Sequence, residues 1–223
     1  MTDAITYEQV ADTALIALDD GKANAFGHDF IALFNAQLDR AEKEAKAVAI
    51  LGRPGLLSGG FDLGVIRSGD QAEINRMVNA GARLIMRLYG HPQPVVVAAT
   101  GHAVALGAFM LLAADLRIGT SGDFKIGLNE TAIGLSLPEF GIMLASARLS
   151  RRHLTRATLG ATLYGPNEAM DIGYLDELAE PHTVREAALA QATALCELDG
   201  LAFASSKEML RGKSIRQVED SLS

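Results

Sequence analysis

Three short stretches of the sequence carry residues that could move a proton. Glycine-rich turns follow apolar residues within Leu57–Leu63 and Gly101–Gly107, and Glu130 is the single carboxylate of the apolar stretch Ile126–Glu130. Backbone N–H groups at two such turns can converge on one oxygen atom, and a carboxylate beside them can take a proton and return it. This combination suits proton transfer next to a thioester carbonyl, so an enzyme is the leading interpretation.

The elements that must position these residues alternate between strand and helix. Short apolar runs, rich in β-branched residues, predict strands, and apolar residues spaced three and four apart predict helices. The predicted strands are 15–18, 48–51, 95–99 and 116–118, and the predicted helices are 28–46, 74–88 and 108–114. This order predicts an α/β fold with right-handed crossovers between parallel strands.

The last third of the chain has a different pattern, which is helical throughout. Helices are predicted over 138–160, 167–174, 183–198 and 201–222, with Gly165-Pro166 and Glu180-Pro181 between them. We therefore expect an α/β core over residues 1–160 that holds the site, followed by a helical segment over 161–223.

Composition excludes several classes of protein. A net charge of -7 disfavours nucleic-acid binding, and the apolar runs are too short to span a membrane. The N-terminus has no secretory signal, and the single Cys196 fits a reducing compartment, so we expect a cytoplasmic protein. The five histidines lack metal-ligand spacing, and no dinucleotide, phosphate-loop or nucleophile-elbow motif is present, so we expect no metal.

Taken in order and spacing, these segments resemble the crotonase superfamily, the enoyl-CoA hydratase/isomerase family of acyl-CoA enzymes. Five segments in the family's order carry the resemblance and together cover most of the chain: 20–25, 57–63, 94–118, 124–137 and 165–178. The resemblance implies a crotonase-like ββα spiral core with a helical C-terminal segment. It also implies a small-molecule acyl-CoA substrate, whose coenzyme A is the only cofactor expected.

The resemblance assigns roles to individual residues. The backbone N–H groups of Phe61 and Leu106 would form an oxyanion hole for an enolate, and Glu130 would be the catalytic carboxylate. Many relatives have glycine at the position of Leu106, so its bulk is expected to affect which acyl groups bind. The full set of residues expected to contact substrate is Lys22, Ala23, Gly60, Phe61, Asp62, Leu63, Leu106, Gly107, Phe109 and Asn129.

The carboxylates distinguish between the reactions of the family. Hydratases use two glutamates to activate one water molecule; Glu130 matches the second, and Phe109 stands at the position of the first. Phenylalanine cannot transfer a proton, whereas one base is enough to shift a double bond. Apolar neighbours would raise the pKa of Glu130 toward that of a useful base. The resemblance therefore favours a 3-enoyl-CoA to 2-enoyl-CoA isomerase.

Other interpretations remain open. The chain could hydrate 2-enoyl-CoA with Glu130 alone or with an unrecognised acid, and relatives also include hydrolases and decarboxylases. A different class of function is a non-catalytic acyl-CoA-binding or assembly protein. An inward-pointing, buried Glu130 would favour the enzyme, and affinity without turnover would favour the binding protein.

Further expectations concern the loop that contains Asp62, the nucleotide end of coenzyme A and the oligomeric state. Asp62 is expected to cap or anchor its loop, and Lys22 could supply charge to the nucleotide of coenzyme A. The resemblance implies a homotrimer or a hexamer. Because the chain ends after Ser223, before the family's usual last helices, we expect a more open acyl pocket.

Overall fold

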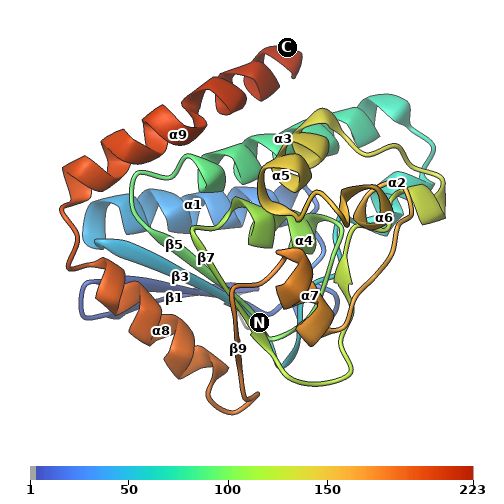
Figure 1. Ribbon diagram of the computed structural model, residues 1–223. Coiled ribbons are helices and arrows are strands. Elements are labelled where there is room, and N and C mark those ends of the chain that lie inside the picture. The colour runs from blue at the N-terminus through green and yellow to red at the C-terminus, as the bar shows by residue number, and fades with distance from the viewer. Residues whose placement is uncertain (1–3, 223) are drawn as a thin grey trace.

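The centre of the fold is a six-stranded sheet, seen in a computed structural model that describes residues 4–222 (Figure 1). In spatial order its strands are β1 (Ile5–Val10), β2 (Thr13–Leu18), β3 (Ala47–Gly52), β5 (Val95–Ala99), β7 (Leu116–Thr120) and β9 (Glu177–Ala179). β1 pairs antiparallel with β2, and the other neighbours are parallel. A mainly parallel sheet requires crossover connections, and helices supply most of them.

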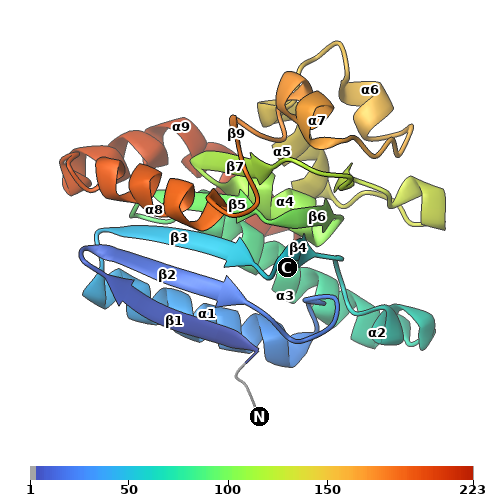
Figure 2. The same ribbon diagram turned by 90° about the horizontal axis from the view of Figure 1, so that it is seen from below.

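Helices cover both faces of this sheet (Figure 2). On one face lie α1 (His28–Glu44), α3 (Gln71–Tyr89) and α4 (Leu106–Ala113), and on the other lies α8 (Val184–Leu195). Alternate residues of a strand point to opposite faces, so β3 sends Val48 and Ile50 toward the first group and Ala49 and Leu51 toward α8. This two-sided burial explains why β3 and β5 are apolar throughout.

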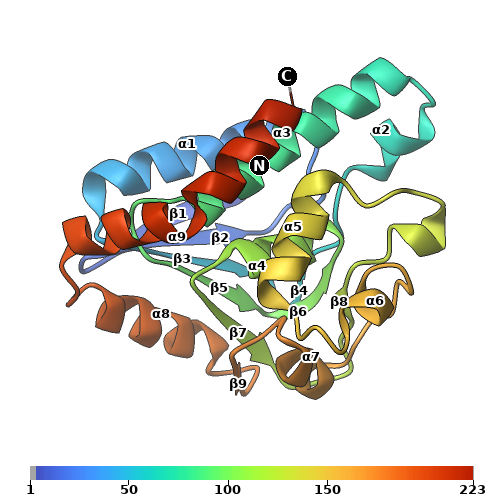
Figure 3. The same cartoon turned by 45° about the horizontal axis from the view of Figure 1, so that its top comes forward.

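A second, smaller sheet is formed by strands that follow those of the first sheet. Its parallel strands, in spatial order, are β4 (Gly55–Ser58), β6 (Gly101–Val104) and β8 (Ile126–Gly127), which directly follow β3, β5 and β7 in the chain (Figure 3). β4 and β6 approach so closely at their first residues that a Cβ on Gly101 would lie 1.9 Å from the Gly55 carbonyl carbon. Only glycine fits there, and the repeated strand–strand–helix unit is the predicted ββα core.

Further helices pack around these sheets and their covering helices. They are α2 (Leu63–Arg67), the 3-10 helix η1 (Thr131–Ile133), α5 (Glu139–Arg148), α6 (Leu154–Ala157), α7 (Pro166–Ile172) and α9 (Gly200–Ser221). α9 packs along α3 and α5. No helix between residues 4 and 222 has the length and apolar character needed to cross a membrane.

The α/β fold class is confirmed, and each predicted strand and most predicted helices are present. The predicted continuous helix over 138–160 is wrong, because the chain leaves helical geometry between α5 and α6. The strands β1, β4, β6, β8 and β9 were not expected from the sequence. Of these, β9 lies in the segment 161–223 and pairs with β7 at the edge of the main sheet.

Candidate active site

The three chemically interesting stretches meet because they follow three neighbouring parallel strands. In the small sheet, Ser58 pairs with Ala103, and Val104 pairs with Gly127. The carboxyl ends of β4, β6 and β8 therefore lie at one edge, which is where ligands bind in open parallel sheets. Residues 59–62, 105–107 and 128–130 continue from that edge.

A hydrogen-bond network fixes the first loop. The Gly60 N–H donates to Ser58 Oγ at 3.0 Å, and that hydroxyl donates to the carbonyl oxygen of Asn24 at 2.8 Å. The Gly59 N–H donates to the carbonyl oxygen of Ala23 at 2.9 Å. The segment around Lys22 and Ala23, which was predicted to contact substrate, is thus tied directly to this loop.

Asn24 and Ser58 are positioning residues that the sequence did not single out. Asn24 is fully buried with a φ of +46°, and its side-chain amide donates to the carbonyl oxygens of Leu18 and Leu57 at 2.9 and 3.0 Å. Asparagine tolerates this left-handed conformation better than most residues. An Asn shortly after an Asp-Gly turn was the available signal for this role.

The second loop reaches α4 through a strained residue. Ala105 caps α4 with a φ of +52°, a conformation that costs a non-glycine residue about 1–3 kcal/mol and clusters at functional sites. Gly60, with a φ of +105°, lies against it: a Cβ there would be 2.8 Å from the Ala105 Cβ and 3.6 Å from the Leu106 nitrogen. The two glycine-rich loops are therefore in direct contact.

The backbone N–H groups of Phe61 and Leu106 lie next to the contact between the two loops. Within residues 4–222 neither donates a hydrogen bond to a protein acceptor. Leu106 is the first residue of α4, where N–H groups lack intrahelical partners and the helix dipole favours negative charge. Their arrangement suits the oxyanion hole assigned above, which stays a prediction.

One cavity of about 310 Å3 opens where the loops meet. Its lining is mostly apolar and includes four of the residues predicted to bind substrate or act on it. The lining residues are Gly59, Phe61, Leu63, Ile66, Arg67, Ala105, Asn129, Glu130, Ile133 and Leu135. A single carboxylate in apolar surroundings is thus placed beside Phe61 and the start of α4.

Glu130 is buried without a counter-charge. Glu130 is only 8% exposed, and its Oε2 atom has no hydrogen-bond partner among the described residues. Burial raises the pKa of Glu130, and the backbone N–H groups of Glu130 and Asn129 partly oppose that rise. The Ile133 and Leu135 N–H groups donate to the Glu130 carbonyl oxygen at 3.0 and 2.9 Å, which holds the turn that presents the side chain. A carboxylate in this setting is suited to be a general base.

Phe109 lies in the core between α4 and α5. Its ring packs edge-on against Phe140, with centroids 4.9 Å apart, and a Cβ on Gly141 would come within 2.6 Å of it. Phe109 is fully buried and is not among the residues that line the cavity. Its predicted contact with substrate stays a prediction.

The other predicted site residues differ in how exposed they are and in what they contact. Asp62 caps α2 by accepting a hydrogen bond from the Gly64 N–H at 2.7 Å, as expected. Gly107 packs so tightly that a Cβ would lie 2.7 Å from the Ser58 carbonyl oxygen. The Leu106 side chain is fully buried and reaches toward Gly81 of α3, so its bulk lies in the core. Lys22 is exposed, with its N–H donating to Asp20 Oδ1 at 2.7 Å.

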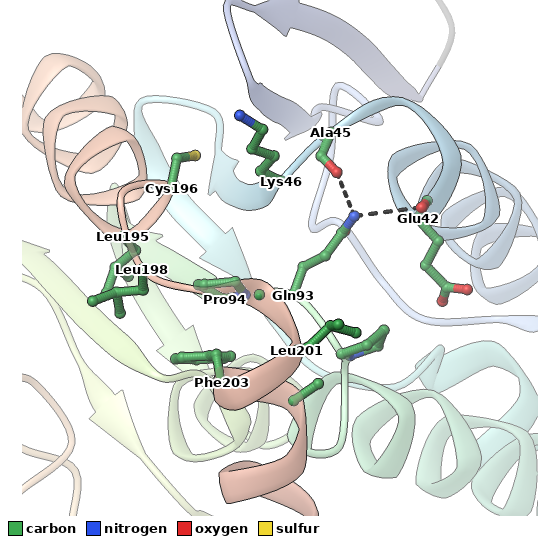
Figure 4. Close-up of a pocket in the computed structure, with 13 residues that line it drawn as sticks. Glu42, Ala45, Lys46, Gln93, Pro94, Leu195, Cys196, Leu198, Leu201 and Phe203 are labelled. Atoms are coloured by element: carbon green, nitrogen blue, oxygen red, sulfur yellow. Dashed lines mark hydrogen bonds between the residues drawn. The ribbon is translucent and has the colours of Figure 1, made fainter.

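A second cavity, of about 320 Å3, lies where α1 and α8 end and α9 begins (Figure 4). The amide of Gln93 donates to the carbonyl oxygens of Ala45 and Glu42 there. Lys46 on its rim is paired with Asp12 at 2.8 Å, and the Cys196 thiol contacts the Ala192 carbonyl oxygen of its own helix at 3.4 Å. This cavity contains no buried, unpaired carboxylate, so the candidate active site is the one at Glu130.

The fold and this site together define an α/β protein with one buried carboxylate beside two backbone N–H groups that have no acceptor among residues 4–222. The sequence profile of the enoyl-CoA hydratase/isomerase family matches residues 8–222. A solved enoyl-CoA hydratase/isomerase family protein from Pseudomonas syringae is 38% identical, with a TM-score of 0.96 over 99% of this chain and 96% of that one. The chain therefore belongs to the enoyl-CoA hydratase/isomerase family, within the crotonase superfamily.

Two further relatives carry more specific names. A solved Mycobacterium tuberculosis protein, named an enoyl-CoA isomerase in one structure and a probable enoyl-CoA hydratase in another, is 33% identical. In the structure named as the isomerase, the TM-score is 0.94 over 100% of this chain and 97% of that one. The mitochondrial enoyl-CoA delta isomerase 1 of Rattus norvegicus is 27% identical over 188 residues, which are 82% of this chain and 65% of the rat protein. These are proteins to which the chain is similar.

Proposed function

We propose that this chain is an enoyl-CoA isomerase that moves the double bond of a 3-enoyl-CoA to the 2-position. The observation that carries the proposal is that Glu130 is the one carboxylate among the described residues lining the cavity. Hydration by the two-carboxylate route of the family needs a second acid, and the position of that acid is occupied by Phe109. The name of the rat relative, an enoyl-CoA delta isomerase, supports the same reaction, and the Mycobacterium tuberculosis relative is named both an isomerase and a hydratase.

The reaction needs one base and one site for negative charge. Glu130 takes a proton from C2 of the 3-enoyl thioester, and the electron pair moves onto the thioester oxygen to give a dienolate. The N–H groups of Phe61 and Leu106 hold that oxygen, and a lost donor of this kind costs about 2.7–4 kcal/mol of barrier. Glu130 then returns the proton to C4 while the C2–C3 double bond forms. Atoms and charge balance without a cofactor other than the substrate's own coenzyme A.

Assembly and location are part of the same proposal. We expect a homotrimer, or a hexamer made of two trimers, in a reducing compartment such as the cytoplasm, which suits a chain whose single cysteine is Cys196. Leu201, Met209 and Leu210 of α9 are 86%, 79% and 79% exposed, and such apolar side chains favour contact with another subunit. Light scattering of the purified protein measures the oligomeric state, and a monomer would contradict this part.

The decisive experiment offers matched 3-enoyl-CoA and 2-enoyl-CoA substrates and identifies the products by chromatography and mass. The proposal expects conversion of the 3-enoyl substrate, loss of that conversion in Glu130→Gln, and retention in Glu186→Gln, an exposed residue of α8 outside the cavity. Water addition to the 2-enoyl substrate would instead identify a hydratase that works with Glu130 alone. Binding without either reaction would identify a non-catalytic acyl-CoA-binding protein.

A further inference from the structure

Glu130 and three residues from its own and neighbouring segments have buried polar side-chain atoms without hydrogen-bond partners. Among the described side chains these atoms are Glu130 Oε2, Asn129 Oδ1 and the hydroxyl groups of Tyr164 and Tyr174. Tyr164 is 3% exposed and Tyr174 is fully buried. Buried polar groups are nearly always satisfied, so several orphans from neighbouring segments require an explanation.

The backbone brings these residues to one place. The N–H of Tyr164 donates to the Ile126 carbonyl oxygen at 2.9 Å, and the Ile126 N–H donates back at 2.9 Å. Ile126 begins β8, which leads directly to Asn129 and Glu130. The short helix α7 separates the two tyrosines in sequence, and their ring centroids lie 6.2 Å apart. Both tyrosines therefore lie next to the segment that carries the candidate base.

The chemistry of the four atoms is complementary. The two hydroxyl groups are donors, whereas Oε2 of an ionised Glu130 and Oδ1 of Asn129 only accept. Burial, then Tyr164, then Glu130 raise the pKa of Tyr174, and the Leu128 backbone partly opposes that rise, so the hydroxyl keeps its proton at neutral pH but still lacks an acceptor. A buried water molecule typically makes about three hydrogen bonds to groups that have no other partner. This set offers such a molecule two donors and two acceptors.

We propose that Tyr174 is a positioning residue for Glu130, its hydroxyl donating to Oε2 through a buried water molecule shared with Tyr164. The proposal rests on the function proposed above, in which Glu130 is the base. Hydrogen bonding at Oε2 would hold the carboxylate in one orientation and leave Oε1 for the substrate. It would also favour the ionised form, and so offset part of the rise in pKa that burial causes.

The test measures the ionisation of Glu130 directly, without substrate. The protein is labelled with 13C at the side-chain carboxyl carbon of glutamate, and the Glu130 resonance is assigned by its loss in Glu130→Gln. We expect Tyr174→Phe to raise the titration midpoint by about one pH unit, a tenfold change in proton affinity. The matched Tyr164→Phe variant should shift the midpoint less. A Tyr174→Phe midpoint equal to that of the wild type, or shifted no more than Tyr164→Phe, overturns the proposal.

A second measurement leaves Tyr174 intact, in case its substitution prevents folding. The phenolic carbon of tyrosine is labelled, and the Tyr174 resonance is assigned by elimination with Phe substitutions at the other three tyrosines. It should shift with pH at the midpoint of Glu130 and lose that shift in Glu130→Gln; a resonance that ignores the Glu130 titration overturns the proposal. Because neither measurement uses turnover, failure of the isomerase assignment and failure of this inference are distinguishable.

Discussion

Two carboxylates, the buried Glu130 and the partly buried Asp115, lie near opposite ends of α4 and have opposite surroundings. Asp115, beyond the last turn, accepts from Lys207 Nζ at 2.6 Å, from Arg211 at 2.9 Å and from the Val95 N–H at 2.8 Å. Glu130, beside the first turn, forms no ion pair in the described part of the chain, and its Oε2 is unpartnered. Asp115 is paired with two cations, whereas Glu130 is paired with none of those between residues 4 and 222.

The difference suits Asp115 to a structural role and Glu130 to the catalytic role proposed for it. Asp115 holds α9 against the core, because both of its cationic partners come from that helix. Burial lowers the pKa of Lys207 to about 8 although Asp115 opposes the change, so the cations depend on this carboxylate. A buried carboxylate without a partner is unfavourable for stability, and such groups concentrate where their chemistry is used. Glu130 has that character.

The largest effect should follow from placing a third carboxylate along α4, in Phe109→Glu. This position has neither the cations of Asp115 nor the cavity of Glu130. Loss of the aromatic packing alone costs about 3–5 kcal/mol, and burial of a carboxyl group adds to it. Denaturant unfolding should show a severely destabilised protein with no gain of hydratase activity. Phe109→Leu is the control for packing; a stable, hydrating Phe109→Glu would mean that this side chain reaches the cavity.

Removing the reactive carboxylate should damage catalysis and spare the fold. Glu130→Gln is expected to lower kcat by about 10²–10⁴-fold, because the general base is lost. Its free energy of unfolding at neutral pH should equal or exceed that of the wild type, since a buried charge is removed without a counter-charge being left behind. Steady-state kinetics and urea denaturation measure the two quantities. A fall in stability together with activity would make Glu130 a structural residue.

Asp115→Asn should have the reverse pattern. Removing one member of a buried ion pair destabilises a protein by about 3–5 kcal/mol, and here Lys207 and Arg211 lose their carboxylate while the hydrogen bond from Val95 can persist. We expect urea denaturation to show a free energy of unfolding about 3 kcal/mol lower than that of the wild type, with kcat per folded molecule nearly unchanged. Asp176→Asn is less informative as a control because Asp176 pairs with Arg117. The exposed Asp199→Asn, at the N-cap of α9, is the control for loss of one negative charge at this helix, because Asn caps a helix about as well as Asp.

Contact between the two loops at the reactive end can be tested at Gly60. Gly60→Ala puts a Cβ 2.8 Å from that of Ala105 at a φ of +105°, so either the loop or the start of α4 must move. We expect a loss of about 10²-fold in kcat, equal to roughly 2.7 kcal/mol, from misplacement of the Phe61 and Leu106 donors. Gly69→Ala, at a φ of +73° with no atom within 4 Å, is the matched control for backbone strain. Equal effects of both substitutions on kcat would remove the argument for an oxyanion hole here.

The sequence was sufficient for the long elements and for the choice of Glu130, which the structure places in the candidate site. Helices α1 and α3 and strands β3 and β5 follow from periodicity, because each is long enough or apolar enough to show it. Glu130 followed from the order of motifs. The small sheet escaped prediction because β4, β6 and β8 have only four, four and two residues, too few to show a period.

Contacts between distant segments could not be predicted in the same way. The ion pair between Asp115 and Lys207 could not be predicted, because the two residues are 92 positions apart in sequence. The direction of the Phe109 side chain depends on how α5 packs, and the orphan hydroxyl of Tyr174 exists only once α7 has turned back toward β8. These features arise from tertiary packing, and local pattern does not encode them.

The smallest predicted effect concerns pH and again separates the two carboxylates. Burial raises the pKa of Glu130 above its ordinary value of 4.5, so the folded protein binds this proton more tightly than the unfolded chain. Its contribution to stability is therefore present below pH 4.5 and is lost as pH rises through the raised pKa, by at most about 1.4 kcal/mol per pH unit. Over the same interval kcat/KM should rise, because the base must be ionised. Glu130→Gln should lose this component of the stability profile, whereas Asp115→Asn should keep it. A difference profile between wild type and Glu130→Gln that is flat from pH 4 to 8 would mean that Glu130 ionises as a solvated side chain does.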